Sequence, residues 1–164
     1  MYRALTMKPE QSHTILNILL ADDDTDDCFF FEKALKEIPI DTHLTVINNG
    51  EKMMNYLFEH EEHLPDVLFL DLNMPRKNGF ECITELKLSQ KLNQLPVVVF
   101  STSFEQEVVK RLYQNGAQHF IRKPAEFAQF KKIIQQTLIL INQKNILQPT
   151  EDNFVITMQT DLPL

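Results

Sequence analysis

Four apolar runs of the sequence each end in side chains that can bind a metal ion or a phosphate. Ligands of an open parallel sheet bind beyond the carboxyl ends of its strands, so such endings can meet at one edge. Asp, Asn and Ser are also common turn residues, and a single polar ending therefore carries little information. Four complementary endings favour a site, and they are Asp22-Asp23-Asp24, Asp71-Leu72-Asn73, Ser101-Thr102-Ser103 and Arg122-Lys123-Pro124.

The chemistry that suits these groups is phosphoryl transfer. Carboxylates gathered in one cleft repel each other and raise each other's pKa, and a hard cation such as Mg²⁺ removes this repulsion. A carboxylate that the metal does not fully occupy can act as a nucleophile and form an aspartyl phosphate. A lysine and a hydroxyl can then bind the phosphoryl oxygens. The expected roles are metal binding by Asp22 and Asp23, nucleophilic attack by Asp71, and phosphate binding by Lys123 and Ser101.

Five apolar, partly β-branched runs alternate with five segments of helical character. This alternation predicts right-handed βαβ units, and hence a three-layer, doubly wound α/β domain with a five-stranded parallel sheet. Gly50 and Gly79 stand at expected helix starts, and Gly116 follows an expected helix end. The expected strands are 17–21, 44–47, 66–70, 97–100 and 119–121, and the expected helices are 25–38, 50–59, 79–90, 105–115 and 126–142.

Composition narrows the class of protein. The chain has 164 residues, 43% of them hydrophobic, which suits one globular domain. It shows no signal peptide and no apolar run long enough to span a membrane, and the net charge of −7 argues against general binding to nucleic acid or anionic membranes. Cys28 and Cys82 lack metal or disulfide spacing, which favours the cytoplasm. We expect a leader at 1–14, a domain at 15–142 and a tail at 143–164.

Four motifs carry a resemblance to bacterial response-regulator receiver domains. The segment Ile18 to Asp24 resembles their acidic opening, and Leu68 to Glu81 resembles their phosphoacceptor strand and loop. Pro96 to Thr102 resembles the switch strand, and Phe120 to Pro124 resembles the lysine–proline end of the fifth strand. The resemblance covers about residues 15–142, and single-domain receivers of the chemotaxis and phytochrome-associated types look similar. It implies a flavodoxin-like topology.

The resemblance also implies a role for each site residue. Asp71 would be the phosphoacceptor, with Asp23, Asp71 and the Asn73 carbonyl as Mg²⁺ ligands and Asp22 bound through a metal-bound water. Ser101 would be the switch hydroxyl, Lys123 would pair with the phosphoryl group, and the Lys123–Pro124 bond is typically cis in such domains. Two positions depart from the commonest pattern: Thr102 replaces a small alanine, and Phe120 is an aromatic switch residue without a hydroxyl.

The implied function is that of a stand-alone response regulator in a two-component phosphorelay. It would receive its phosphoryl group from a histidine kinase or a phosphotransfer protein, and would catalyse only its own phosphorylation and dephosphorylation. It would signal through protein contacts, as a monomer or homodimer, on a downstream target that the sequence does not identify. The usual partner face of such domains would here present Lys110, Arg111, Gln114 and Arg122.

Other readings of the same residues are weaker. A pseudo-receiver, which binds partners without taking phosphate, would not need the complete set of reactive groups found here. A haloacid-dehalogenase-type phosphatase needs an acid where this chain has Asn73, and a flavodoxin-like cofactor binder needs a glycine- and hydroxyl-rich loop after the first strand. A calcium-binding loop at 22–33 would need a glycine at its sixth position and a glutamate at its twelfth, where this chain has Asp27 and Lys33. We interpret Asp24, Asp26 and Asp27 as charges at a helix N-terminus.

The C-terminal tail contains one apolar segment that is unusual for a disordered end. Pro149 prevents the fifth helix from continuing, and 148–153 reads as a linker. The run from Phe154 to Met158 is apolar and β-prone, which disordered tails usually are not. We therefore expect it to dock on its own domain or on a neighbouring copy, by adding to a sheet edge or lying in a groove. A frayed terminus is the alternative.

Overall fold

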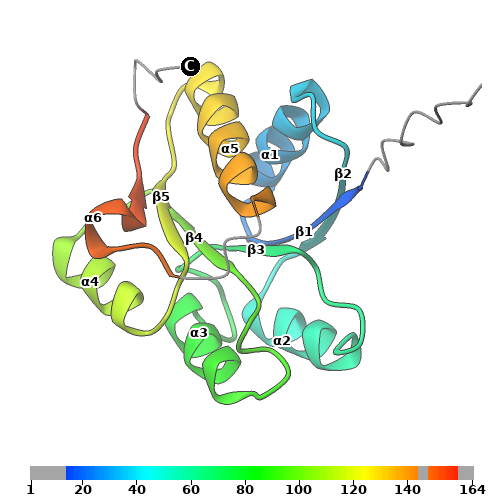
Figure 1. Cartoon of the computed structure of the whole chain (residues 1–164), viewed down its shortest axis with the longest axis vertical. Coiled ribbons are helices and arrows are strands. Elements are labelled where there is room, and N and C mark those ends of the chain that lie inside the picture. The colour runs from blue at the N-terminus through cyan, green and yellow to red at the C-terminus, as the bar shows by residue number, and fades with distance from the viewer. Residues whose placement is uncertain (1–13, 144–147, 159–164) are drawn as a thin grey trace, which may run out of the picture.

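The computed structural model describes residues 14–143 and 148–158. Strands and helices alternate along the chain up to the last helix of the main domain (Figure 1). The strands are β1 Leu16–Ala21, β2 Thr42–Ile47, β3 Val67–Leu70, β4 Val97–Ser101, β5 His119–Arg122 and β6 Val155–Ile156. The helices are α1 Thr25–Glu37, α2 Gly50–Glu59, α3 Gly79–Leu88, α4 Gln106–Gln114, α5 Phe127–Asn142 and α6 Glu151–Phe154.

All strands pair in parallel, in the order β2-β1-β3-β4-β5-β6. Figure 1 shows α1 and α5 on one face of the sheet and α2 and α3 on the other. Each face covers its own buried cluster, one around Phe31 and Phe100 and the other around Leu57 and Phe120. The doubly wound, three-layer architecture is therefore confirmed. The expected strand number of five is wrong, because β6 adds a sixth strand beside β5.

Side-chain caps place three helix starts at the carboxyl edge of the sheet. Asp24 accepts hydrogen bonds from the N–H groups of Asp26 and Asp27, and Asn49 and Asn78 cap α2 and α3 in the same way. These caps hold the first turns of α1 and α2 shortly after β1 and β2, and the first turn of α3 at the end of the loop that follows β3. The loop after β3 also passes close to α2, since a Cβ added to Gly50 would lie 2.0 Å from the Lys77 carbonyl oxygen.

The C-terminal tail closes the β5 edge of the sheet within the same chain. Tyr113 donates a hydrogen bond to the Pro149 carbonyl and its ring packs edge-on against Phe154, which is buried. In β6, Val155 pairs with Phe120 and Ile156 pairs with Ile121. The docking of the apolar run on its own domain, by addition to a sheet edge, agrees with expectation. The linker expected at 148–153 is only partly extended, because α6 occupies its second half.

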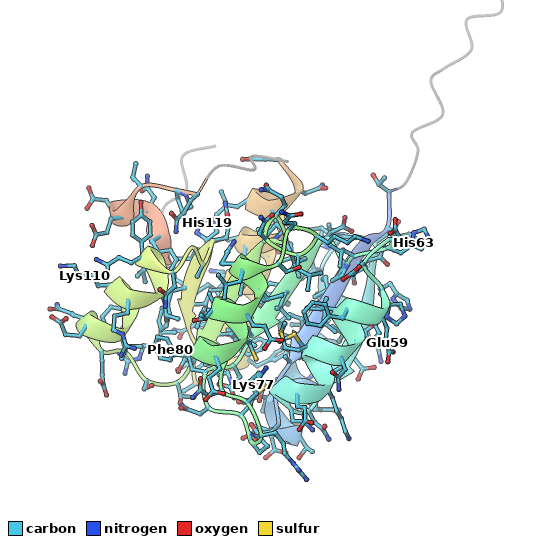
Figure 2. The ribbon with its side chains drawn as sticks, turned by 90° about the horizontal axis from the view of Figure 1, so that it is seen from below. Glu59, His63, Lys77, Phe80, Lys110 and His119 are labelled. Carbon is cyan, nitrogen blue, oxygen red and sulfur yellow. The ribbon has the colours of Figure 1, made fainter. Side chains whose placement is uncertain are left out.

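Polar groups also join the tail to α4 and β5. The Gln148 amide donates to the carbonyls of Tyr113 and Ala117, at 2.7 and 2.8 Å. His119 lies beside the tail (Figure 2), and its Nδ1 is 3.3 Å from the Phe154 carbonyl oxygen. The tail thus satisfies backbone and side-chain groups at an edge that would otherwise face water.

Two further expectations concern the ends and the backbone. The leader expected at 1–14 lies almost wholly outside the described residues, as do 144–147 and 159–164 of the tail. The described residues contain no cis peptide bond, so the cis Lys123–Pro124 bond that the resemblance implies is not found. Within 14–143 and 148–158, no helix is both long and apolar enough to cross a membrane.

Candidate functional site

The strand ends named by the sequence meet in one open pocket at the carboxyl edge of the sheet. Its volume is about 500 Å³. It lies where β1, β3 and β5 end and where α1 begins, as expected for an open parallel sheet. Its walls come from Asp23, Asp24, Thr25, Asp26, Asp27, Asp71, Asn73, Thr102 and Lys123.

Three carboxylates in this region can share one cation. Asp22, Asp23 and Asp71 each offer an oxygen, and these oxygens all lie within 4.8 Å of one another. Asp22 and Asp71 are buried, at 1% and 7% exposure, whereas Asp23 is exposed. Oxygen ligands from carboxylates, open to water on one side, suit a hard divalent cation such as Mg²⁺. We call these three residues the acidic triad.

Lys123, which directly follows β5, places its ammonium group beside the acidic triad. Its Nζ is 2.8 Å from Asp22 Oδ2, 2.8 Å from Asp27 Oδ2 and 4.0 Å from Asp71 Oδ1, and its side chain is 6% exposed. Burial alone would lower the pKa of Lys123, but the hydrogen bonds to Asp22 and Asp27 outweigh it and raise the pKa above its usual value. The lysine therefore stays charged, and its ammonium lies within reach of a group attached to Asp71.

Burial is the main influence on Asp71. It raises the pKa of the carboxyl to about 6, with a smaller opposing effect from Lys123 and a further rise from nearby Asp22. The Asn73 N–H is 3.4 Å from Asp71 Oδ1, a weak contact that favours the ionised form. Near neutral pH, Asp71 is thus an ionised but poorly stabilised carboxylate, which favours both cation binding and nucleophilic attack.

The two expected switch residues lie in different surroundings. The Ser101 hydroxyl is buried and pairs with the Ser103 hydroxyl at 3.2 Å, and it also accepts from the Ser103 N–H. It has no hydrogen bond to Asp71, and its neighbour Thr102 lines the pocket instead. Phe120 is fully buried, packs against Phe104 and pairs through its backbone with the tail. The structure therefore brings together the acids and the lysine, while Ser101 points to its own loop.

Asp27 is the site residue that sequence reasoning missed. We interpreted it only as a helix N-terminal charge, and it does lie in the first turn of α1. It also pairs with Lys123 as closely as Asp22 does. Helical side chains lean toward the helix N-terminus, and the N-terminus of α1 lies at the carboxyl edge of β1. That geometry is the signal that could have found it.

Comparisons with known proteins agree with this site. Residues 18–135 match the family model of the response regulator receiver domain, which covers more than half of the chain. The chain therefore belongs to the response regulator receiver domain family, and the resemblance seen in the sequence is confirmed. It is a phosphoacceptor signalling module of the two-component kind and not a classical enzyme.

Similar proteins place the chain near phytochrome-associated regulators. It is 30% identical over 122 residues to response regulator Rcp1 of Synechocystis sp., covering 72% of this chain and 83% of that protein. It is 28% identical, also over 122 residues, to the probable methanogenesis regulatory protein FilR2 of Methanothrix harundinacea, covering 73% and 79%. Two solved structures are similar. The phosphorylated cyanobacterial phytochrome response regulator RcpA has a TM-score of 0.73 at 27% identity, covering 80% of this chain and 96% of that one. Mn²⁺-bound Rcp1 has a TM-score of 0.69 at 28% identity, covering 82% of this chain and 99% of that one.

Proposed function

We propose that this chain is a response regulator that takes a phosphoryl group onto Asp71 and signals through protein contacts. The observation that carries the proposal is the buried Asp71 carboxylate, 4.0 Å from the buried Lys123 ammonium and next to two further acids. Receiver domains interact with histidine kinases, and such a kinase or a phosphotransfer protein is the proposed donor. The proposed location is the cytoplasm, where receiver domains typically act.

The transfer is a displacement at phosphorus. An Asp71 carboxylate oxygen attacks the phosphorus of a phosphohistidine, and the P–N bond breaks as its electron pair returns to the imidazole nitrogen, which takes up a proton. Lys123 then pairs with the phosphoryl oxygens, since its Nζ already faces Asp71. The Ser101 hydroxyl would leave Ser103 to bind the same group, which links the pocket to β4. Phosphoryl transfer depends mainly on such positioning and charge stabilisation.

Mg²⁺ is the proposed cofactor. Asp23 and Asp71 would bind it directly, together with the Asn73 carbonyl, and Asp22 would bind through a metal-bound water. The bound cation supplies positive charge that screens the acids from one another and from the incoming phosphoryl group. Mn²⁺-bound Rcp1 is a similar protein that holds a divalent cation.

The output is proposed to pass through β5 and its neighbours. Phe120 lies on β5, where it pairs with Val99 of β4 on one side and with Val155 of the tail strand β6 on the other. A partner that binds the face formed by α4, β5 and α5 would therefore also meet α6 and β6.

Phosphorylation by acetyl phosphate with Mg²⁺, followed by intact mass spectrometry, tests the function. We expect wild type to gain one phosphoryl group, and Asp71→Asn to gain none because the amide is not a nucleophile. Asp26→Asn, an exposed acid in the same pocket wall, should still be labelled. Labelling of Asp71→Asn at the wild-type level would contradict the assignment of Asp71. No labelling of wild type by acetyl phosphate or by a phosphorylated histidine kinase would favour a pseudo-receiver.

A further inference from the structure

Asp27 contacts the same lysine as Asp22, although Asp27 lies outside the acidic triad. Its Oδ2 is 2.8 Å from Lys123 Nζ, the distance at which Asp22 Oδ2 also lies. The Asp27 side chain is 26% exposed, whereas that of Asp22 is 1% exposed. Lys123 is thus held between a buried acid that belongs to the triad and a more open acid that does not.

These contacts create a competition for Asp22. A divalent cation at the triad needs the oxygens of Asp22, directly or through a water, and the Lys123 ammonium occupies one of them. Asp71 Oδ1 is 4.0 Å from the ammonium, beyond a good hydrogen bond. Without Asp27, the lysine would therefore keep Asp22 as its one hydrogen-bonded carboxylate among the described residues, and a buried charge that loses its partner is strongly destabilised.

We propose that Asp27 is a positioning residue, which holds Lys123 so that Asp22 is free to serve the cation. This inference rests on the proposed function, because it concerns the same cation and phosphoryl sites. When a cation engages Asp22, the ammonium keeps one close carboxylate partner at Asp27. Asp27 therefore favours metal binding in the resting protein.

The same contact opposes phosphoryl binding. A phosphoryl group on Asp71 needs the Lys123 ammonium, and Asp27 competes for it while adding negative charge nearby. Removal of the Asp27 carboxylate should therefore change the two affinities in opposite directions: weaker for the cation and stronger for the anion. A purely structural role for Asp27 would weaken both.

Two matched variants test this assignment. Asp27→Asn removes the carboxylate that contacts Lys123 and keeps the side-chain size. Asp26→Asn removes the same charge from the same turn of α1, where the carboxylate has no hydrogen bond or ion pair with any described residue. Mg²⁺ affinity is measured by titration calorimetry. The affinity for beryllofluoride, an analogue of the phosphoryl group, is measured by fluorine NMR at saturating Mg²⁺.

For Asp27→Asn we expect Mg²⁺ affinity to fall roughly three- to tenfold and beryllofluoride affinity to rise by a similar factor, with less than about twofold change for Asp26→Asn. Equal changes in the two variants would overturn the proposal in favour of a general charge effect. A loss of both affinities in Asp27→Asn would overturn it in favour of a structural role. Wild type that binds neither probe would overturn the proposed function itself, together with this inference.

Discussion

The carboxyl end of β5 and its outer edge lie in opposite environments. At its carboxyl end, Lys123 faces several acids in an open pocket, and two of those acids, Asp22 and Asp71, are buried. Along its outer edge, β5 pairs with β6, and Phe154 is buried in the same apolar cluster as Phe120 of β5. The pocket lining has five carboxyl side chains and one lysine, so it suits a positively charged ligand, whereas the edge is completed by the chain itself.

This difference shows how the fold separates reactivity from stability. The raised pKa of Asp71 means that its ionised form is disfavoured in the folded protein, so the pocket stabilises a bound cation at some expense to the unliganded fold. The tail works in the other direction, because it buries apolar surface and pairs polar groups. No buried side-chain nitrogen or oxygen of residues 14–143 and 148–158 lacks a hydrogen-bond partner.

The pocket was also easier to predict than the edge. Asp22, Asp71 and Lys123 directly follow apolar runs, and strand ends of a parallel sheet must meet at one edge. Helix geometry could have placed Asp27 near the pocket, but its pairing with Lys123 also depends on where α1 packs after β1. The orientation of the Ser101 hydroxyl was not visible, since it depends on a loop conformation.

The edge was predictable only in outline. The apolar run after Pro149 indicated docking, but a two-residue strand such as β6 carries no period of its own. Its pairing with β5 depends on contacts between the tail and residues far away in sequence, such as the contacts of Pro149 and Gln148 with Tyr113. That long-range dependence explains why the strand count was wrong while the layer architecture was right.

The largest expected effect comes from a substitution in the tail that covers the β5 edge. Phe154→Ala should destabilise the protein by about 3 kcal/mol, because a buried aromatic ring is lost and the contact with Tyr113 goes with it. Thr157→Ala, at an exposed position on the same tail, should change stability by less than about 0.5 kcal/mol. Urea unfolding measures both. Equal stability of Phe154→Ala and wild type would show that the tail does not hold the β5 edge in solution.

An intermediate effect tests the pocket. Without metal, Asp71→Asn should stabilise the protein by on the order of 1 kcal/mol at pH 7.5. This value is smaller than the full pKa shift of Asp71 implies, because solvent in the open pocket screens its charge. The folded pKa, about 6, exceeds the ordinary value of 3.8, so ionisation of Asp71 destabilises the fold as pH rises through this interval. The gain should therefore shrink toward pH 4. Saturating Mg²⁺ should also reduce it, by stabilising wild type.

Glu107→Gln provides the control for Asp71→Asn, since it removes an exposed carboxylate from the first turn of α4, outside the pocket. Its effect on urea unfolding should be small and independent of Mg²⁺. A stability gain for Asp71→Asn that does not change between pH 7.5 and pH 4.5 would contradict the view that charge in the pocket is its cause.

The smallest expected effect is a pH dependence at the tail, opposite in sign to that of the pocket. Burial lowers the pKa of His119 below the ordinary value of 6.5, although the backbone carbonyls of Phe154 and Asn153 partly oppose this. The folded state therefore disfavours the charged ring. The contribution of neutral His119 to stability is complete above pH 6.5 and declines as pH falls below this value.

Because His119 contacts the tail directly, protonation of its ring should loosen β6 before the rest of the sheet. We expect the free energy of unfolding of wild type, relative to His119→Gln, to fall by a few tenths of a kcal/mol, roughly, between pH 7.5 and pH 5.5. Subtracting the two curves removes the contribution of Asp71, which both proteins share. A difference that stays constant over this range would show that the ring does not sense the tail. A difference that grows as pH falls would mean that docking favours the charged ring, and would reverse the assigned direction of the pKa shift.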